Sequence, residues 1–293
     1  MQLRISKFAF QNRAMTTEDL IRTGYRARVA NTPDGRTMAE ALVTVIMPAR
    51  NAAGTIGKSI QSVRSQSFKD WELIVIDDAS EDRTAEIVKW FIAKDKRIRL
   101  LRLPKWRGVA AARNRGLDLA RTRFIAFLDS DDAWEPQKLE RQIAFMMESG
   151  TAITFGAYRR VDVEGNTLGV VVPPTKVSRR MMLRSNFIGN LTAVFDRQRL
   201  PDLRFKPVGN EDYVFWVNAL EQLREPVLAT PGATPIARYR VAGDSLSGNK
   251  INSLRWQWEN YRRNLGFGLV RSSFYLTSYA LHGLIKRRPS KDA

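Results

Sequence analysis

The feature that most restricts the fold is a regular alternation of short apolar runs and longer amphipathic segments, which begins at Leu42. Short apolar runs between polar residues are typical of buried strands, and apolar residues three and four positions apart are typical of helices. The expected strands are Val43–Met47, Glu72–Ile76, Ile98–Leu103 and Phe124–Asp129. The expected helices are about Thr55–Ser65, Arg83–Ala93, Val109–Ala120 and Pro136–Met147. This order predicts right-handed βαβ units, and therefore an α/β fold with a mostly parallel sheet covered by helices on both faces.

The pattern becomes less regular after Gly150. Two strand-like runs flank Glu164-Gly165-Asn166, which predicts a hairpin. Helices are expected near Ser178–Arg184 and Glu211–Leu223. Residues 1–41 show no sustained period and contain a Thr-Pro-Asp-Gly turn, so we expect a loosely attached basic extension with at most one short helix.

The charge balance indicates an anionic partner. The chain has 48 Lys and Arg against 30 Asp and Glu, which gives a net charge of +18. A surplus of this size favours nucleic acid, an anionic lipid surface or a phosphorylated substrate as a partner. The charge alone does not distinguish these three.

The scarcity of cysteine and histidine excludes several kinds of site. The chain has no Cys, which excludes disulfides, thiolate metal sites and cysteine nucleophiles. His282 is the single histidine, whereas a zinc site usually needs several such ligands and a Ser-His-Asp triad needs one at a defined place. We therefore expect neither of these sites.

No segment has the pattern of a signal peptide or of a membrane span. The first 15 residues are interrupted by Arg4, Lys7 and Arg13. The most apolar stretch, Leu265–Ile285, contains Arg271 and His282. We therefore expect a cytoplasmic protein without a spanning helix.

Polar residues directly follow three of the four predicted strands, and ligands of open parallel sheets bind beyond such carboxyl ends. The three runs are Pro48-Ala49-Arg50-Asn51, Asp77-Asp78-Ala79-Ser80 and Asp129-Ser130-Asp131-Asp132. Each acidic run alone also fits a helix cap or a turn, and Pro-Ala-Arg-Asn alone is nearly uninformative. Five carboxylates at one sheet edge of a basic protein, however, repel each other unless a cation or a set of donors neutralises them. A divalent metal ion with oxygen ligands fits this edge.

Together these runs resemble the family 2 glycosyltransferases, which have the GT-A nucleotide-sugar fold. The resemblance covers about residues 42 to 245 and is most specific in the first hundred of them. The stretches that carry it are VTVIMPARNAAGTI, SIQSVRSQSFKDWELIVIDDASEDRT, GVAAARNRGLDLARTRFIAFLDSDDAWEPQKLE and, less closely, LRFKPVGNEDYVFWVNAL.

The resemblance implies a donor site for a nucleotide sugar, with a UDP-sugar as the expected donor. Pro48, Ala49, Arg50 and Asn51, with Asp77 and Asp78, would cradle the base and ribose, and Arg113 would be a further donor-site residue. Asp129-Ser130-Asp131 matches the Asp-x-Asp motif of the family. Asp131 would hold Mg²⁺ or Mn²⁺ at the two phosphates, while Asp129 would face the ribose or the water shell of the metal. A surface charge on a helix is the alternative for Arg113.

Glu211-Asp212 resembles the catalytic Glu-Asp pair of the family. An inverting transfer needs a base that removes the acceptor hydroxyl proton and a metal that neutralises the departing diphosphate. Asp212 is the expected base and Glu211 the acceptor-side or orienting carboxylate. The alternative is that both acids only complement the dipole of a helix N-terminus.

Two departures from the family pattern affect this site. Ala242 stands where many members have a His that helps to hold metal or diphosphate, so Arg240 and Ser247 are the expected phosphate contacts there. Arg50 stands where the family often has an aromatic residue, which leaves the stacking of the base undefined.

The C-terminal segment, residues 250–293, mixes aromatic and basic residues, including Lys286-Arg287-Arg288 after an apolar stretch. Such a helical segment either packs on the domain or lies in an anionic membrane interface. We therefore expect three regions: an N-terminal extension (1–41), a GT-A domain (42–249) with nucleotide-binding and acceptor halves (42–135 and 136–249), and this C-terminal segment. The expected location is the inner face of the cell membrane, where the acceptor would be a glycan or lipid-linked saccharide of surface or exopolysaccharide synthesis.

Two other function classes remain open at this stage. A nucleotidyltransferase that makes nucleotide sugars shares the sheet and the metal, but Ala52-Ala53-Gly54 is a poor match to the glycine-rich loop it needs. A nucleic-acid-binding protein would use the positive charge directly. No recognised binding motif is present, however, and the acidic strand ends would repel a phosphate backbone. We therefore expect no nucleic-acid partner.

Overall fold

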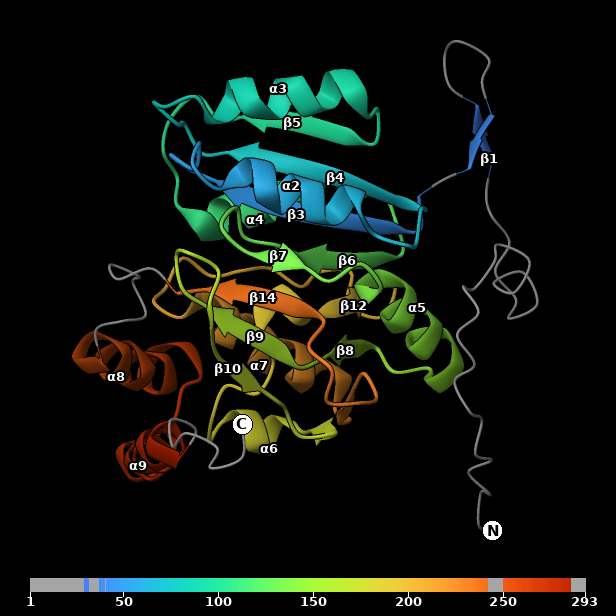
Figure 1. Ribbon diagram of the computed structural model, residues 1–293. Helices are drawn as coiled ribbons and strands as arrows, with labels where there is room; N and C mark the ends of the chain where they lie inside the picture. The colour runs from blue at the N-terminus through green and yellow to red at the C-terminus, as the bar shows by residue number, and fades with distance from the viewer. Residues whose placement is uncertain (1–28, 32–36, 40, 242–249, 286–293) are drawn as a thin grey trace.

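The computed structural model describes residues 29–31, 37–39, 41–241 and 250–285 (Figure 1). Before the main domain, strands β1 (Val29–Asn31) and β2 (Thr37–Ala39) form a two-stranded antiparallel sheet. The sequence pattern had indicated at most a short helix in this extension. The rest of residues 1–41, apart from Ala41, lies outside the described residues.

The first half of the domain has the expected βαβ order. Strands β3 (Val43–Ala49), β4 (Trp71–Asp77), β5 (Ile98–Arg102) and β6 (Phe124–Phe127) are parallel, in the spatial order β6-β3-β4-β5. The helices that connect and follow them are α2 (Ile56–Arg64), α3 (Thr84–Lys94), α4 (Val109–Leu119) and α5 (Lys138–Ser149). The carboxyl ends of β3, β4 and β6 therefore meet at one edge of the sheet, as predicted.

The second half extends the same sheet with strands of mixed direction. The full order is β11-β13-β8-β12-β6-β3-β4-β5. Strand β12 is antiparallel to both of its neighbours, β6 and β8, so the whole sheet is mixed. The predicted parallel arrangement of the sheet holds for the strands of the first half. The added strands are β8 (Ile153–Phe155), β11 (Lys176–Val177), β12 (Val194–Asp196) and β13 (Val227–Ala229).

A smaller four-stranded sheet lies beside the main one in the order β10-β9-β14-β7. It contains the predicted hairpin, which is confirmed as the antiparallel pair β9 (Tyr158–Val161) and β10 (Thr167–Val171). Strands β14 (Ala237–Arg240) and β7 (Ala133–Trp134) complete it. Because β7 follows the acidic run after β6, this sheet brings β14 next to that run.

The remaining helices surround the second half. These are α6 (Arg179–Met182), the 3₁₀ turn η1 (Asn190–Thr192), α7 (Glu211–Leu223), α8 (Lys250–Glu259), the π-helix η3 (Asn260–Asn264) and α9 (Leu269–Ile285). Figure 1 shows α8 and α9 together at one side of this half. The helices predicted near Ser178–Arg184 and Glu211–Leu223 are confirmed.

The core lies on both faces of the sheet, as continuous apolar strands require. In β3, Val45 and Met47 join a cluster with residues of α2, α3 and α5. Ile46, which points to the other face, joins a cluster with residues of α4 and α7. A Cβ at Gly116 would overlap the Ile46 side chain, so this glycine lets α4 lie close against β3.

The C-terminal helices are part of this second core cluster. Tyr261 is fully buried, and its hydroxyl donates to the carbonyl oxygen of Leu183 at 2.6 Å. Phe267 and Tyr275 are buried beside it. The sequence left open whether the aromatic residues of the C-terminal segment pack on the domain or lie in a membrane interface. Tyr261, Phe267 and Tyr275 pack in the core.

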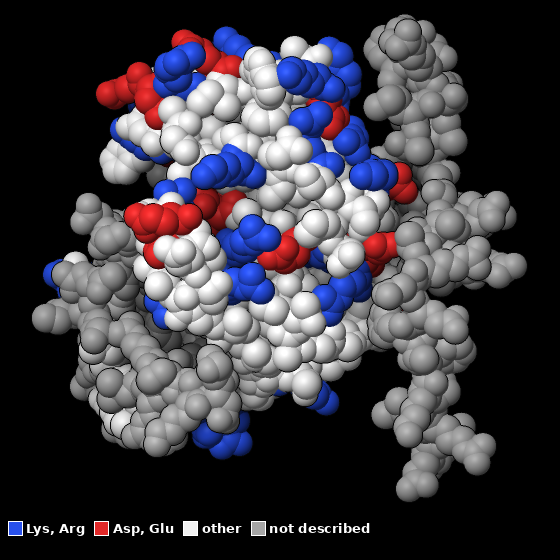
Figure 2. All heavy atoms as spheres, in the orientation of Figure 1, with Lys and Arg blue, Asp and Glu red and all other residues white. Residues whose placement is uncertain are grey.

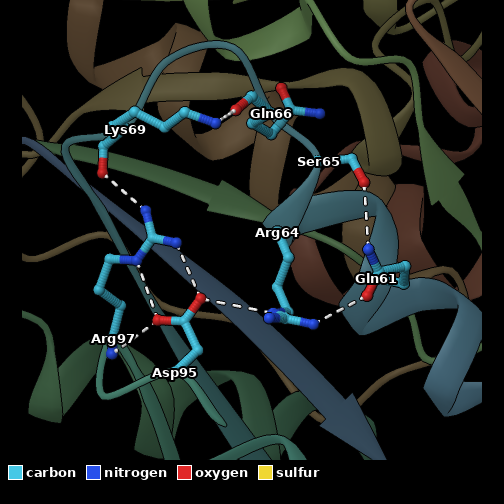
Figure 3. A network of polar contacts seen from close by, with 7 residues as sticks. All are labelled: Gln61, Arg64, Ser65, Gln66, Lys69, Asp95 and Arg97. Atoms are coloured by element: carbon cyan, nitrogen blue, oxygen red, sulfur yellow. Dashed lines mark hydrogen bonds and ion pairs between the residues drawn. The ribbon is translucent and has the colours of Figure 1, made fainter.

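A network of polar contacts joins the loops at the amino edge of the sheet, opposite the edge where the carboxyl ends of β3, β4 and β6 meet (Figure 3). Arg97 donates to both carboxylate oxygens of Asp95, at 3.0 and 2.8 Å, and Arg64 reaches Asp95 Oδ2 at 3.4 Å. Arg97 also donates to the carbonyl oxygen of Lys69 at 3.1 Å, and its guanidinium lies 3.7 Å from the centre of the Trp71 ring. The network fixes the loops that enter β4 and β5.

The positive charge is spread over the face of the molecule that Figure 2 shows. On the face shown in Figure 2, Lys and Arg occur over both halves and are mixed with Asp and Glu, without a single basic stripe. Within the described ranges, no helix is long and apolar enough to cross a membrane.

Candidate active site

The carboxylates after β6 form the centre of the candidate site. Asp129 and Ser130 are half-buried and Asp131 is exposed in the turn that follows this strand. Asp132 is buried, and its Oδ1 accepts a hydrogen bond from the backbone N–H of Arg240 at 2.9 Å. The turn thus points carboxylates from β6 toward the end of β14.

Mutual repulsion marks this group of acids. Burial, followed by the charges of Asp129 and Asp131, raises the pKa of Asp132 well above its usual value. Desolvation by the surrounding protein and the charge of Asp129 also raise the pKa of Asp131, while Arg240 acts in the opposite direction. Asp131 forms no ion pair with any described residue. The cluster therefore holds negative charge that the described part of the protein does not fully neutralise.

Arg113 connects this cluster to α7. It projects from α4 and is only 3% exposed. Its guanidinium donates to Asp129 Oδ1 at 2.7 Å and to Glu211 Oε1 at 2.6 Å. Burial disfavours the charged form, but the two carboxylates together outweigh it and raise the pKa of Arg113 above its usual value. The alternative of an exposed helix charge is therefore wrong for this residue.

Glu211 and Asp212 form the first turn of α7. Oδ1 of Asp212 accepts from the backbone N–H of Tyr213 at 2.8 Å, and Oδ2 lies 3.5 Å from Asn186 Nδ2. Burial and the neighbouring charge of Glu211 raise the pKa of Asp212 to about 6, against the opposing effect of Arg113. A carboxylate with this pKa is mostly ionised at neutral pH and is a stronger proton acceptor than an ordinary Asp.

The C-terminal helices hold the start of α7 in place. Asn260 donates through Nδ2 to the carbonyl oxygen of Gly209 at 2.8 Å. A Cβ at Gly209 would overlap the ring of Trp256, so α8 packs directly on the loop before Glu211. The aromatic C-terminal segment therefore contributes to the position of the Glu-Asp pair.

The ends of β3 and β4 lie next to each other, as expected for parallel neighbours. Pro48 and Ala49 are buried in the last two positions of β3, and Arg50 and Asn51 beyond them are exposed. Asn51 has φ 47° and accepts through Oδ1 from the backbone N–H of Glu81 at 2.9 Å. The exposed part of this run is thus Arg50 and Asn51.

Asp77 and Asp78 are both buried and already have partners. Oδ1 of Asp77 accepts from the backbone N–H of Ser80 at 2.9 Å, and Oδ2 lies 3.3 Å from Arg102 Nε. The two carboxylate oxygens of Asp78 accept from the backbone N–H groups of Arg107 and Gly108, at 2.8 and 2.7 Å. In this structure Asp78 fixes the loop between β5 and α4, and its predicted contact with a nucleotide stays a prediction.

A groove of about 650 Å³ opens beside the acidic turn, between α2 and the β9–β10 hairpin. Asp131, Arg240 and Lys58 are among the residues that line it. Arg240 also donates to the carbonyl oxygen of Val163 at 3.2 Å. The predicted phosphate contact Arg240 therefore lies near Asp131, while Ser247 and Ala242 lie outside the described residues.

The acidic turn fits a divalent cation that shares its coordination with a ligand. Asp129 and Asp131 supply hard oxygen donors, which suit Mg²⁺ and Mn²⁺. Among the described residues there is no group of three His, Cys, Asp or Glu arranged to hold a metal. A cation here would therefore take its remaining ligands from phosphate oxygens and water, and it would relieve the repulsion that raises the pKa of Asp131.

The comparison with known families agrees with this arrangement of strand ends. Residues 44–196 match the sequence model of the family described as "Glycosyl transferase family 2". The chain belongs to this family. It is therefore a glycosyltransferase, and the predicted family and enzyme class are confirmed.

Curated relatives of this family 2 chain match it over most of its length. It is 38% identical over 249 residues to the Escherichia coli protein WfgD, a UDP-Glc:alpha-D-GlcNAc-diphosphoundecaprenol beta-1,3-glucosyltransferase. The matched region covers 85% of this chain and 96% of WfgD. It is 33% identical over 252 residues to TuaG of Bacillus subtilis, a putative teichuronic acid biosynthesis glycosyltransferase, with coverage of 84% and 97%.

Solved glycosyltransferase structures share the fold. TarS of S. aureus (residues 1–349), in complex with UDP-GlcNAc, superposes with a TM-score of 0.62 at 20% identity, over 81% of this chain and 71% of that chain. The mannosyltransferase PcManGT of Pyrobaculum calidifontis, in complex with GDP-Man and Mn²⁺, gives 0.61 at 18% identity, over 91% and 76%. The predicted GT-A fold of this family 2 chain is thus confirmed.

Two residues at the edge of the candidate site, Asn186 and Trp106, were not predicted from the sequence. Asn186, beside Asp212, lies in an irregular loop after α6 and comes near α7 only through the fold. Trp106, in the loop held by Asp78, is 65% exposed and has the Arg50 guanidinium 5.2 Å from its ring centre. In the sequence it stands in a Pro-Lys-Trp-Arg-Gly loop that resembles any basic turn.

Proposed function

We propose that this glycosyltransferase moves a hexose from a UDP-sugar to a hydroxyl group of a glycan or lipid-linked acceptor, in one displacement with inversion at the anomeric carbon. The observation that carries the proposal is the pair of contacts from buried Arg113 to Asp129 and Glu211, which brings the Asp-x-Asp turn and the Glu-Asp pair to one place. The similarity to WfgD, a UDP-Glc:alpha-D-GlcNAc-diphosphoundecaprenol beta-1,3-glucosyltransferase, supports the choice of donor and acceptor class.

The first task of the site is to hold the diphosphate of the donor. Asp131 and Asp129 would hold Mg²⁺ or Mn²⁺, which when bound neutralises charge that develops on the departing diphosphate. The backbone N–H of Arg240 donates to Asp132 and its charge acts on Asp131, so its side chain would add positive charge near a diphosphate bound there. Arg113 keeps Asp129 in a fixed orientation, since its Nη2 donates directly to that carboxylate.

The second task is to remove a proton from the acceptor. In the transfer, the acceptor oxygen forms a bond to the anomeric carbon while the bond from that carbon to the diphosphate oxygen breaks, and its electron pair leaves with UDP. The hydroxyl proton passes to a carboxylate oxygen of Asp212. The contacts from Tyr213 and Asn186 orient this carboxylate, and its pKa of about 6 lets it accept the proton at neutral pH.

The transfer reaction can be tested directly with purified protein. We expect UDP release from UDP-glucose or UDP-N-acetylglucosamine in the presence of Mn²⁺ or Mg²⁺, and a glycosylated product when a lipid diphosphate carrying one N-acetylglucosamine is added. An excess of EDTA should abolish both. Full activity in EDTA would contradict the assignment of the metal, and no turnover with any UDP-sugar would contradict the proposed donor.

We further propose that the protein works at the surface of an anionic membrane, on its cytoplasmic face, and that the outer face of α9 touches the lipid. Val270, Phe274 and Leu281 are 87%, 57% and 55% exposed and lie on one side of this helix. The opposite side, with Ser272 and Tyr275, is buried against the domain. An exposed apolar stripe on a basic protein has the chemistry of an interfacial helix.

Point substitutions test this better than removal of the segment, because Tyr261 belongs to the core. We expect binding to vesicles that contain phosphatidylglycerol, weaker binding to neutral phosphatidylcholine vesicles, and a decrease as salt rises. A Val270→Ser, Phe274→Ser double variant should lose most of this binding. Leu168→Ser, at a residue of β10 that is 50% exposed, is the matched control and should bind as the wild type does. Equal binding by all three would contradict a role for α9.

A further inference from the structure

Tyr158, the first residue of β9, is held by its backbone and by its ring. Its backbone pairs with Ala237 of β14 and with Val171 of β10. A Cβ at Gly189 would lie only 3.3 Å from Cε1 of Tyr158, so the ring packs directly on the loop between α6 and η1. The Tyr239 ring lies 6.2 Å away in an edge-to-face arrangement. None of these contacts uses the hydroxyl group of Tyr158.

This hydroxyl group has no hydrogen-bond partner among the described residues. The Tyr158 side chain is half-buried, and its oxygen is not enclosed by the protein. Tyr261 shows the usual arrangement of a tyrosine in the interior, because its hydroxyl donates to the carbonyl oxygen of Leu183 at 2.6 Å. The hydroxyl of Tyr158 is therefore available to a ligand.

The hydroxyl group lies within reach of charges at both the acidic turn and the proposed base. Burial raises the pKa of Tyr158 to about 12, and the charges of Asp132 and Asp212 act in the same direction, against that of Arg160. The group therefore stays protonated at neutral pH. In this form it can both donate and accept a hydrogen bond.

The loop under the Tyr158 ring also contacts the proposed base. Asn186 stands three residues before Gly189, and its Nδ2 lies 3.5 Å from Oδ2 of Asp212. The ring and the base are thus joined through one short segment of the chain. This places Tyr158 on the side of the site where the proton of the acceptor is removed.

The same loop continues into η1, which is fixed by side chains from two other elements. Trp134 of β7 donates through its indole N–H to the carbonyl oxygen of Leu191 at 2.8 Å. Gln142 of α5 donates through Nε2 to the carbonyl oxygen of Thr192 at 2.9 Å. A surface that is already fixed loses little conformational freedom when a ligand binds to it.

We infer that the Tyr158 hydroxyl binds a hydroxyl group of the acceptor sugar, beside the one from which Asp212 removes the proton. Sugar hydroxyls donate and accept hydrogen bonds, which matches a protonated phenol. An acceptor without that hydroxyl would leave the phenol unpaired, so the contact would contribute to acceptor specificity. The inference rests on the proposed function, since it assumes a saccharide acceptor and Asp212 as the base.

The experiment compares acceptors that differ by one hydroxyl group. Transfer from UDP-glucose with Mn²⁺ is measured for the wild type and for Tyr158→Phe, which keeps the ring and its packing. The acceptors are a lipid diphosphate that carries one N-acetylglucosamine and its deoxy analogues, each without one hydroxyl. The analogue that lacks the reacting hydroxyl is identified by its failure to react with the wild type.

We expect Tyr158→Phe to lower kcat/KM for the complete acceptor roughly 3- to 15-fold, the scale of one hydrogen bond between neutral groups. The KM for UDP-glucose and the melting temperature should not change. One further deoxy analogue should be a poorer acceptor than the complete one for the wild type, by a similar factor. Tyr158→Phe should use this analogue and the complete acceptor equally well, because the two changes remove the same contact.

Tyr275→Phe is the matched control. It also removes one phenol oxygen, from a residue of α9 that is 9% exposed, and it should keep the wild-type preference between the two acceptors. Wild-type kinetics of Tyr158→Phe on every acceptor would overturn the inference and leave the proposed function intact. An equal loss on all acceptors together with a lower melting temperature would also overturn it, because the role would then be structural.

Two further outcomes separate the acceptor from the donor. A raised KM for UDP-glucose with unchanged acceptor preference would overturn the inference, because it would place the hydroxyl of Tyr158 at the donor sugar. A wild type that releases UDP from UDP-glucose but transfers to no saccharide would contradict the proposed function, and the inference would fall with it.

Discussion

Asp95 at the amino edge of the parallel sheet and the acids after β6 and at the start of α7 have pKa values that are shifted in opposite directions. At the amino edge, hydrogen bonds from Arg97 lower the pKa of Asp95 against the effect of burial, and Arg64 adds a further contact. At the carboxyl edge, desolvation by the surrounding protein and repulsion from neighbouring acids raise the pKa values of Asp131, Asp132 and Asp212. Asp95 thus stabilises the folded protein, whereas Asp131, Asp132 and Asp212 are costly to ionise.

This difference indicates where function is located. Acids whose ionised form is disfavoured by their surroundings are frequent at functional sites, and three of them lie together at the carboxyl edge. Arg113 offsets part of the cost by its contacts with Asp129 and Glu211, but among the described residues it forms no ion pair with Asp131. A cation and a diphosphate would supply the missing compensation, whereas the Asp95 network is complete within the chain.

Replacement of Asp131 should have the largest effect on catalysis. Asp131→Asn keeps the shape of the side chain but removes the ligand charge, so we expect the transfer rate to fall by about a thousandfold or more, the scale of losing a metal-held charge at a leaving group. Its melting temperature without ligand should equal or exceed that of the wild type, because the lost charge is repelled by Asp129. A large loss of stability together with activity would show that the acid is structural.

Replacement of Asp212 should have the next largest effect. Asp212→Asn should lower kcat by at least about a hundredfold, as expected for loss of a general base, and leave UDP affinity nearly unchanged. The wild-type rate should fall about tenfold per pH unit below pH 6, because the base must be ionised and its pKa is about 6. Asp212→Asn should lose that dependence. A collapse of UDP affinity in the variant would make Asp212 a donor ligand.

The amino edge should respond in stability and not in catalysis. Asp95→Asn removes the charged acceptor of Arg97 and Arg64, so we expect the free energy of unfolding at pH 7 to fall by about 1 to 2 kcal/mol. Because the pKa of Asp95 is lowered in the folded state, its contribution is present above about pH 4 and is lost as the pH falls further. Denaturant melts of both proteins at pH 7 and pH 3 should therefore converge at the lower pH. A changed kcat in Asp95→Asn would contradict the prediction that this acid has no role in catalysis.

The sequence predicted the parts of the site that depend on local pattern. The acidic turn of Asp129 to Asp132 and the run ending in Asp78 follow buried strands, and the sheet geometry brings such ends together. The strands β12 and β13 were not predicted, because runs of three residues carry too little periodicity to be recognised. Their placement depends on pairing with distant partners, which includes the antiparallel contact of β12 with β6.

The site residues that the sequence did not reveal depend on tertiary contacts. In the sequence alone, Arg113 fits a surface charge on α4 equally well. In the structure, Gly116 lets α4 lie close against β3, and the Arg113 guanidinium contacts Glu211, which is 98 residues further along the chain. Trp106 and Arg50 lie 56 positions apart, and nothing in either loop indicates the contact. The three-region division of the chain stays a prediction, although the buried Tyr261 shows that the C-terminal helices share the core of the domain.

The measurement that tests this account most directly is the melting temperature of the wild type and of Asp131→Asn, each with UDP and Mn²⁺, with UDP and EDTA, and alone. A ligand at a hundred times its Kd stabilises the folded state by about 2.7 kcal/mol, which corresponds to roughly 5 °C or more for a domain of this size. We predict this increase for the wild type with UDP and Mn²⁺ only, and none for Asp131→Asn in any condition. An equal increase in EDTA, or in the variant, would contradict the claim that the acids of the carboxyl edge are held there for a metal-bound diphosphate.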